Sequence, residues 1–282
     1  MSESVRGFVN RGDRSGASVP LRGVLLPYLF WNALKKQWRI MRSYGFNFVL
    51  QVASLVLFFG LIYFGARVLV GPNSARFGRT IEGLLIGYWL WIGVIMSWSV
   101  FAWSVIQYAQ QGLLEQLFMT PWGLRGILTL EAAASFVLDL LLNLLLLVVF
   151  MLMSGHWLRL EPVTTFLLYV ATLLPGYGIG YALAGLAMRF KNIQSLFNLM
   201  QFFVIGLQAM PVDRYPWLNV FPFAQSTRML IQHVRMGTLW WEFSWQVWAI
   251  VLAQAAGYLV FGLWVYGWLE RAARERGLLA HY

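Results

Sequence analysis

Four polar residues recur at every fourth position inside an otherwise apolar stretch: Glu131, Ser135, Asp139 and Asn143. In an α-helix this spacing places the four side chains along one face. A carboxylate facing lipid in the middle of a membrane costs roughly 2.5–3.5 kcal/mol on insertion scales, so the stripe must face protein or water. It serves either hydrogen bonding between helices or a translocation surface or proton site. Hydrogen bonding is the simpler interpretation, because no Lys or Arg in the apolar stretches is an obvious partner.

Motifs for hydrolysis or metal chemistry are missing from the sequence. The chain has no cysteine, which excludes disulfides, thiol nucleophiles and thiolate metal sites. His156, His233 and His281 lie far apart, in segments expected to be loops or the tail. No pair of histidines has the spacing of metal ligands, and no G-x-x-x-x-G-K-[ST] loop is present to bind ATP. We therefore expect no catalytic residue, no metal and no cofactor in this chain.

The elements that position the polar stripe are expected to be membrane-spanning helices. Of the 282 residues, 60% are hydrophobic and 11% are charged. The mean hydropathy is +0.64. Soluble domains have about 25% charged residues, so this chain has too few charges to cover a soluble surface. Its net charge of +10 would suggest nucleic acid on a soluble protein. On a chain this apolar, membrane topology explains the charge, and no nucleic-acid partner is expected.

Six charge-free stretches reach or approach the roughly 20 residues that a spanning helix needs. They are 43–66, 83–114, 140–158, 162–188, 192–212 and 243–269. The third is expected to extend back through 127, which brings Glu131 and Asp139 into the span. The apolar runs are continuous, unlike the alternating pattern of a β-barrel. We predict an all-α integral membrane fold, in which 44–268 forms a transmembrane domain of six helices.

An even number of spans places both termini on one side of the membrane. That side carries fourteen of the Lys and Arg residues and the other side seven, so the positive-inside rule places both termini in the cytoplasm. Residues 1–20 lack the apolar core of a signal peptide and are expected to form a flexible cytoplasmic arm. Residues 269–282 are expected to form a basic cytoplasmic tail.

Segment 21–43 is expected to hold an amphipathic helix on the membrane surface. Pro27 suits the first position of a helix, from which 25–42 follows. One face carries Trp31, Leu34, Trp38 and Met41. Aromatic side chains at headgroup level beside cations are typical of an interfacial helix. A second interpretation is that the basic face also meets a cytoplasmic partner. That face carries Asn32, Lys35, Lys36, Arg39 and Arg42.

Between the second and third spans, 112–121 is expected to form a short cytoplasmic helix that ends before Pro121. Its apolar residues recur at helical spacing, which an ordinary turn between helices does not explain. A short helix offering Leu and Phe is suited to a groove on another protein. The residues expected in that contact are Leu113, Leu114, Glu115, Leu117, Phe118 and Pro121.

The longest connection, 211–242, is too apolar for a solvated loop. It contains an expected amphipathic helix at 224–236, with Met229, Leu230 and Val234 opposite Arg228, Gln232 and Arg235. We expect short helices that dip back into the outer leaflet, which is tolerated where protein buries their ends. The residues expected to mark these reentrant helices are Pro216, Trp217, Pro222 and Arg228.

Two motifs resemble the membrane subunit of ABC-2-type ATP-binding-cassette exporters. The segment from Gly112 to Pro121, GLLEQLFMTP, is similar to the family's G-T-L-E-x-L-x-x-T-P segment after the second span, with Leu113 replacing Thr. The segment from Tyr215 to Arg228, YPWLNVFPFAQSTR, is similar to the P-x-W-L…P-[LF]…R loop before the last span. In topology the resemblance covers nearly the whole chain. It points to the branch without a large extracellular domain.

The resemblance implies a permease in the bacterial cytoplasmic membrane, which pairs with a second, identical permease subunit and two ATPase subunits. ATP and Mg would bind the ATPases, so this chain is not an enzyme on its own. Segment 112–121 would dock on the ATPase, segment 25–42 would be the connecting helix, and the second and fifth spans would line the path. Related exporters move drugs, lipids, lipid-linked glycans or polysaccharides. The alternatives are a secondary transporter or channel that uses Glu131 and Asp139, and a membrane scaffold.

Overall fold

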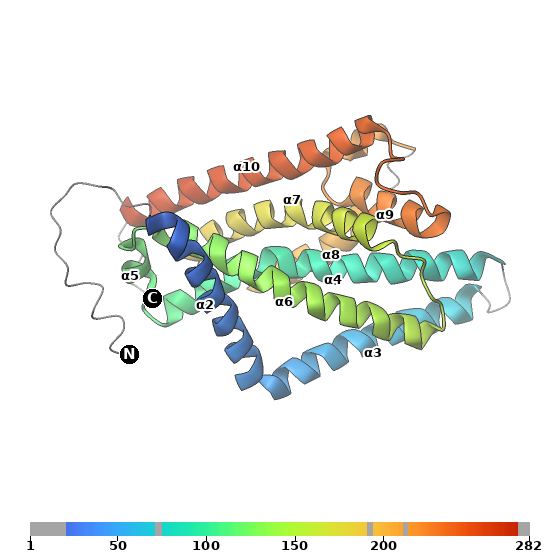
Figure 1. The fold of residues 1–282 in the computed structure, drawn as a ribbon, viewed down its shortest axis with the longest axis horizontal. Helices are drawn as coiled ribbons and strands as arrows, with labels where there is room; N and C mark the ends of the chain where they lie inside the picture. The colour runs from blue at the N-terminus through green and yellow to red at the C-terminus, as the bar shows by residue number, and fades with distance from the viewer. Residues whose placement is uncertain (1–20, 71–74, 191–193, 211–213, 276–282) are drawn as a thin grey trace.

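The computed structural model describes residues 21–70, 75–190, 194–210 and 214–275. The predicted arm at 1–20 lies outside these ranges. Every regular element within them is helical (Figure 1). In chain order the elements are α2 (Leu21–Ser43), α3 (Gly45–Val70), α4 (Ala75–Gln110), α5 (Leu114–Phe118), α6 (Gly123–Ser154), α7 (Pro162–Arg189), α8 (Gln194–Gln208), η1 (Pro216–Val220), α9 (Ala224–Met236) and α10 (Trp245–Glu275).

Among the described residues, five helices are long and apolar enough to cross a membrane: α3, α4, α6, α7 and α10. The chain is therefore an all-helical, multi-pass membrane protein, as predicted. The expected extension of the third apolar stretch is confirmed, because α6 runs without a break through Glu131 and Asp139. The last helix is longer than predicted. It continues to Glu275, and Leu269 and Ala273 are buried, so the start of the expected tail belongs to the bundle.

Within the described residues, the fifth apolar stretch forms a helix shorter than the other five. Its helix, α8, has 15 residues, which at about 1.5 Å per residue is shorter than the roughly 30 Å hydrocarbon core. It ends before Pro211, since the residue preceding a proline disfavours the α conformation. Helix α8 still carries the chain along α4 in the opposite direction. The Phe197 ring lies 5.4 Å from that of Trp98 between centroids, the Gln201 carbonyl accepts from Trp91 Nε1 at 2.9 Å, and Ala209 and Gly83 line one cavity.

Helix α7 lies at the centre of the bundle, with α4 on one side and α10 on the other (Figure 1). Its small residues allow this double contact. A Cβ at Gly176 would overlap Ser97 of α4, and one at Gly178 would overlap the Tyr258 backbone of α10. A Cβ at Gly262 of α10 would in turn meet the Gly178 backbone. Backbones that approach this closely increase van der Waals contact, which drives helix association in membranes.

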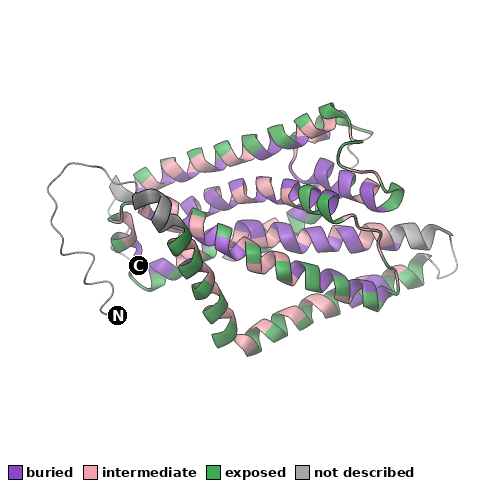
Figure 2. Cartoon of the chain, viewed as in Figure 1, coloured by how far each residue is buried: buried purple, intermediate pink, exposed green. Residues whose placement is uncertain are grey.

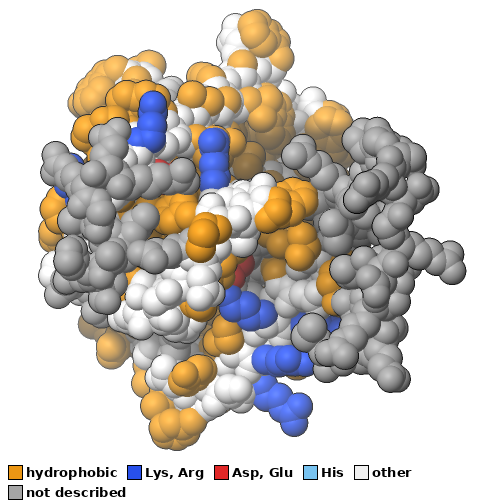
Figure 3. Space-filling model, turned by 90° about the vertical axis from the view of Figure 1, so that its left-hand side faces the viewer, with side chains coloured by type: hydrophobic (Ala, Val, Ile, Leu, Met, Phe, Trp, Pro, Cys, Tyr) orange, Lys and Arg blue, Asp and Glu red, His pale blue; other side chains and the backbone are white. Residues whose placement is uncertain are grey.

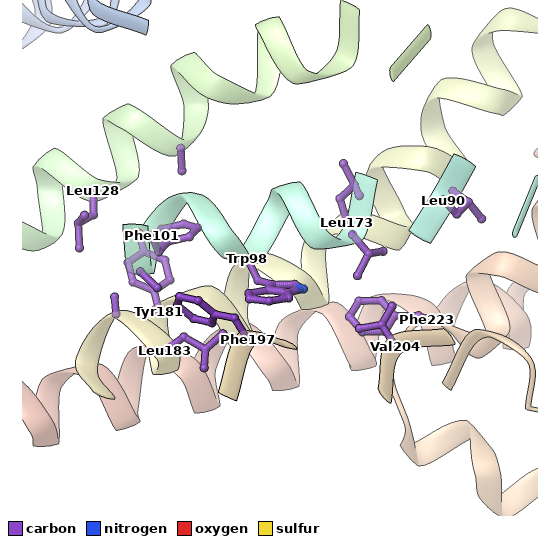
Figure 4. Packing of buried hydrophobic residues seen from close by; sticks show 14 of the residues in the cluster. Leu90, Trp98, Phe101, Leu128, Leu173, Tyr181, Leu183, Phe197, Val204 and Phe223 are labelled. Carbon is purple, nitrogen blue, oxygen red and sulfur yellow. The ribbon is translucent and has the colours of Figure 1, made fainter. Parts of the chain in front are cut away.

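The buried core extends from α4 to α6, α7 and α8 (Figure 2). Trp98 is fully buried, and Figure 4 shows it beside Phe197 of α8. Phe101 of α4 lies against Tyr181, with ring centroids 4.4 Å apart. Helix α3 is joined to the bundle through a smaller cluster, in which Phe59 stacks on Phe150 of α6 with centroids 4.5 Å apart. Much of α3 therefore remains exposed.

Helix α2 lies crosswise to the spans and packs against α6 (Figure 1). Two details differ from the sequence prediction. The helix begins at Leu21, so Pro27 lies inside it and not at its first position. The expected apolar face is divided, because Leu34 and Met41 are half-buried whereas Trp31 and Trp38 are exposed. The face of α2 that packs on α6 is narrower than the expected apolar face and includes the buried Ala33. Trp31 and Trp38 lie outside it.

The predicted helix at 224–236 is present as α9, with the same bounds. Met229, Leu230 and Val234 are buried, and Arg228 and Arg235 are exposed, as the pattern indicated. His233, by contrast, is not in a loop. It is buried in α9, where Nδ1 lies 2.7 Å from the Thr238 carbonyl oxygen and Nε2 accepts from the Glu161 N–H at 3.3 Å. It ties α9 to the start of α7.

Candidate functional site

Glu131, the first residue of the polar stripe, forms a charged cluster with α2 and α4. Lys36 donates to Glu131 Oε1 and, at 2.9 Å, to the Tyr108 hydroxyl oxygen. The Tyr108 hydroxyl donates to the same carboxylate oxygen. The apolar stretches were expected to offer no Lys or Arg partner to the stripe, and the partner of Glu131 indeed comes from outside them. Lys36 belongs to the surface helix, outside the apolar stretches, and only the packing of α2 on α6 brings its ammonium to the carboxylate.

The cluster lies at the margin between protein and solvent. The Lys36 side chain is 43% exposed, whereas that of Glu131 is 6% exposed. Glu131 Oε2 is buried without a hydrogen-bond partner in the described part of the chain. Because a buried carboxylate is stable as an ion only when it is paired, Lys36 and Tyr108 together keep this charge in the bundle.

The other members of the stripe have three different surroundings. Asn143 is fully buried against α4, where its Nδ2 lies 3.7 Å from Met96 Sδ and its backbone carbonyl oxygen accepts from Trp89 Nε1 at 3.0 Å. Ser135 is buried, and Asp139 is half-buried. No hydrogen bond or ion pair to the Asp139 carboxylate is present among the described residues.

Asp139 lines a cavity of about 610 Å³ between the α2–α3 junction and helices α4 and α6. We name this cavity the Asp139 groove. Asn47 and Gln51 of α3, one helical turn apart, face Ser135 and Asp139 across it. Sequence reasoning missed this second stripe, although two amides four residues apart at the start of an apolar span are a usable signal. The groove is lined by Gln37, Ile40, Met41, Tyr44, Asn47, Phe48, Gln51, Trp103, Gln107, Ser135, Leu138 and Asp139.

A second cavity of about 230 Å³ adjoins the groove and shares Phe48, Gln51, Ser135 and Asp139 with it. Its remaining walls are mostly apolar, and include Val52, Leu55 and Leu142. The lining of the two cavities is therefore more polar in the Asp139 groove and more apolar in the adjoining cavity.

The outward face of α2 carries the other residues predicted on this helix. Trp31 and Trp38 are exposed, and Lys35 Nζ lies 5.3 Å from the centroid of the Trp31 ring. Arg39 and Arg42 are also exposed. These five side chains therefore remain accessible to headgroups or to a partner. Lys36, by contrast, is engaged within the bundle.

Helix α5 lies at the end of the bundle where α4 ends and α6 begins (Figure 1). Leu114 is buried in the core, and Leu113, Leu117 and Phe118 are half-buried against it. The apolar spacing of this turn is thus explained by packing on its own bundle. Exposed residues of the turn are Gln116, Met119 and Pro121. The side chain of Glu115 lies outside the described residues.

The predicted reentrant residues differ in burial. Pro216 and Trp217 are exposed, whereas Pro222 is buried and Arg228 is exposed on α9. Gln254 of α10 holds η1 in place, because its Nε2 donates to the carbonyl oxygens of Asn219 at 2.5 Å and Phe221 at 3.0 Å. The connection is therefore a packed structure at the end of the bundle opposite α5.

The end that carries α5 is rich in cations. Figure 3 views it directly and shows Lys and Arg side chains among apolar ones, with little acidic surface. Arg125 follows α5, Arg189 ends α7 and Arg271 lies near the end of α10. In the described part of the chain no three His, Asp or Glu side chains gather into a possible metal site.

Comparisons with protein-family models, with curated proteins and with solved structures give no match.

Proposed function

We propose that this chain is the permease subunit of an ATP-driven exporter of the ABC-2 type, in a bacterial cytoplasmic membrane with both termini in the cytoplasm. The observation that carries the proposal is the position of α5. It is a short helix in a tight turn between two spans, at the cationic end of the bundle, and it presents Met119 and Gln116 outward. A turn of this kind can receive force from an ATPase and pass it to α4 and α6.

The cluster around Glu131 supports the same mechanism. Tyr108 is in the last turn of α4, just before α5, and Lys36 lies on α2. Movement of α5 would reach α2 and α6 together through these contacts. In this proposal α2 is the connecting helix, α8 completes a sixth crossing, and η1 and α9 cap the path from outside.

A second copy of the chain is part of the proposal, because the helices of one copy leave little room for a large amphiphile. We place the seam along α3 and α8. Leu57, Leu61 and Phe64 form an exposed apolar stripe on α3, and Leu199 and Phe202 are exposed on α8. Closed twofold pairing is the commonest arrangement for identical subunits.

Purification with a co-expressed ABC ATPase tests the proposal. Native mass spectrometry should find two copies of this chain with two ATPase copies. Met119→Asp should abolish ATPase binding without disturbing the fold, because this side chain is 79% exposed. Met236→Asp, at a residue 76% exposed on α9, is the matched control and should bind normally. Leu117 and Phe118 are poorer test positions, since both pack on the core. A monomer that transports in liposomes without any ATPase would contradict the proposal.

A secondary transporter or channel is the second candidate, favoured by the unpaired Asp139 in its polar groove. Flux in ATP-free proteoliposomes, driven by a proton gradient and abolished by Asp139→Asn, would select it. The exporter proposal expects no such flux.

A further inference from the structure

We infer that the Asp139 groove binds an organic cation with an apolar body. The inference starts from charge. Among the described residues, Asp139 is the only charged residue that lines the groove, and no Lys or Arg contributes to its walls. On α2, Lys36 is engaged by Glu131 and Tyr108, and Arg39 and Arg42 do not line the groove. The Asp139 carboxylate is thus half-buried with no protein cation to balance it, which favours a positively charged ligand.

The polar wall supplies further contacts that suit an ammonium or similar head. Gln37, Asn47, Gln51 and Gln107 line the groove, and their side chains make no hydrogen bond within the described ranges. Their carbonyl oxygens are acceptors for a cationic N–H donor. Trp103 and Tyr44 add aromatic surfaces, which attract cations that lie over their faces.

The lining of the adjoining cavity favours a cation with an apolar body over a sugar or a bare metal ion. Apart from Ser99, its polar lining residues are those that it shares with the groove, and its Val52, Leu55 and Leu142 walls offer nothing to a hydroxyl group, so a sugar would lose hydrogen bonds along these walls. A bare metal ion would leave this apolar space unused. An apolar body joined to a cationic head fills both cavities, and their volumes of about 610 and 230 Å³ are in the range of sites for drug-sized molecules.

Binding in this groove does not depend on ATP or on a partner subunit. That the bound molecule is the cargo rests on the export function proposed above. The test therefore measures binding alone, so that failure of the export proposal leaves its result unchanged.

The probes are tetraphenylphosphonium and tetraphenylborate, which match in size and shape and differ in the sign of charge. Binding is measured to the full chain in phosphatidylcholine nanodiscs, with empty nanodiscs subtracted. We expect saturable binding of tetraphenylphosphonium and none of tetraphenylborate in the groove. Asp139→Asn keeps the shape of the side chain and should weaken tetraphenylphosphonium binding at least tenfold. Glu242→Gln, which removes an exposed carboxylate outside the groove, should bind within twofold of the parent chain.

Three results would overturn the inference: unchanged affinity in Asp139→Asn, equal binding of both probes, or an equal loss in Glu242→Gln. Displacement of tetraphenylphosphonium by neutral dodecyl maltoside at lower concentration than by dodecyltrimethylammonium would assign the groove to glycolipids instead. A melting curve of Asp139→Asn that matches the parent chain excludes misfolding as the cause of a loss.

Discussion

A single pair of side chains, Lys36 and Glu131, connects a surface helix to a membrane span. The partners are unequal, because the carboxylate is buried and the ammonium is almost half exposed. Removing the Lys36 ammonium would leave the Glu131 carboxylate buried without a counter-charge. Removing both groups would leave no buried charge. The free energy at stake therefore lies mostly in the desolvated Glu131.

Lys36→Met should destabilise the protein by about 1–2 kcal/mol, less than the 3–5 kcal/mol typical of a fully buried pair, because Lys36 is partly solvated. The melting temperature should fall by roughly 3–6 °C. Thermal unfolding in detergent, followed by size-exclusion chromatography, measures this.

Lys35→Met is the matched control, since Lys35 is exposed and contacts the Trp31 ring. Its melting temperature should stay within about 1 °C of the parent value. The double variant Lys36→Met with Glu131→Gln should recover most of the loss. Equal effects of Lys35→Met and Lys36→Met would argue against the pair.

Glu161 provides a pH-dependent contact at the start of α7, outside the span. Hydrogen bonds from Thr164, including its N–H at 2.6 Å, and from the Val163 N–H lower the pKa of this carboxyl below its ordinary value. A lowered folded-state pKa means that the cap is fully present above the ordinary value and is lost as the pH falls through the lowered one. Hydrogen exchange at Val163 and Thr164, corrected for intrinsic rates, should show reduced protection at pH 3 relative to pH 6. Glu161→Gln should remove most of this difference.

At the scale of elements, α7 is held against α10 by contacts in which one backbone touches another, whereas Gly176 and Gly180 of α7 lie closest to the Ser97 and Phe101 side chains of α4. The backbone contacts have no side chain that can move aside. The α7–α10 contact is the most extensive in the described bundle, and it depends on Gly178 and Gly262 having no Cβ.

Gly262→Ala should therefore separate α10 from α7 and cost at least the 1–3 kcal/mol typical of overpacking. The yield of monodisperse protein and its melting temperature should both fall. Gly257→Ala lies on the same helix with open space around it and should be neutral or slightly stabilising. A normal melting temperature for Gly262→Ala would show that α10 does not pack as described.

The sequence predicted the elements better than the contacts between them. Continuous apolar runs indicate helices, and amphipathic spacing gave the bounds of α9, because both signals are local. Charge-free length does not report where a helix ends, and the helix within the fifth apolar stretch, α8, has 15 residues in the described part of the chain. The partner of Glu131 is 95 residues away in sequence, and the groove is made by four separate segments. Neither arrangement has a local signal.

At the scale of the whole molecule, α5 and the end of α10 lie at one end, and α9 lies at the other (Figure 1). Exposed tryptophans occur toward both ends, with Trp31 and Trp38 on α2 and Trp217 and Trp241 near α9. This distribution fits two membrane–water interfaces.

The chain has no cysteine, so single-cysteine labelling can test its orientation directly. Met236→Cys should react with a membrane-impermeant maleimide in intact spheroplasts. Met119→Cys should react only after the membrane is opened. The two side chains are equally exposed, which makes them matched positions. Labelling of Met119→Cys in intact spheroplasts would reverse the topology.

The central position of α7 has a consequence for biosynthesis. It is the least hydrophobic of the five long spans, and it leaves the ribosome before α10, which covers one of its sides. During the synthesis of more than fifty further residues, its glycine-rich side has only lipid or an insertion chaperone to face. A nascent chain stalled before α10 therefore displays a poorly hydrophobic helix within the bilayer. We expect membrane quality-control proteases to recognise incompletely synthesised chains by this exposed helix.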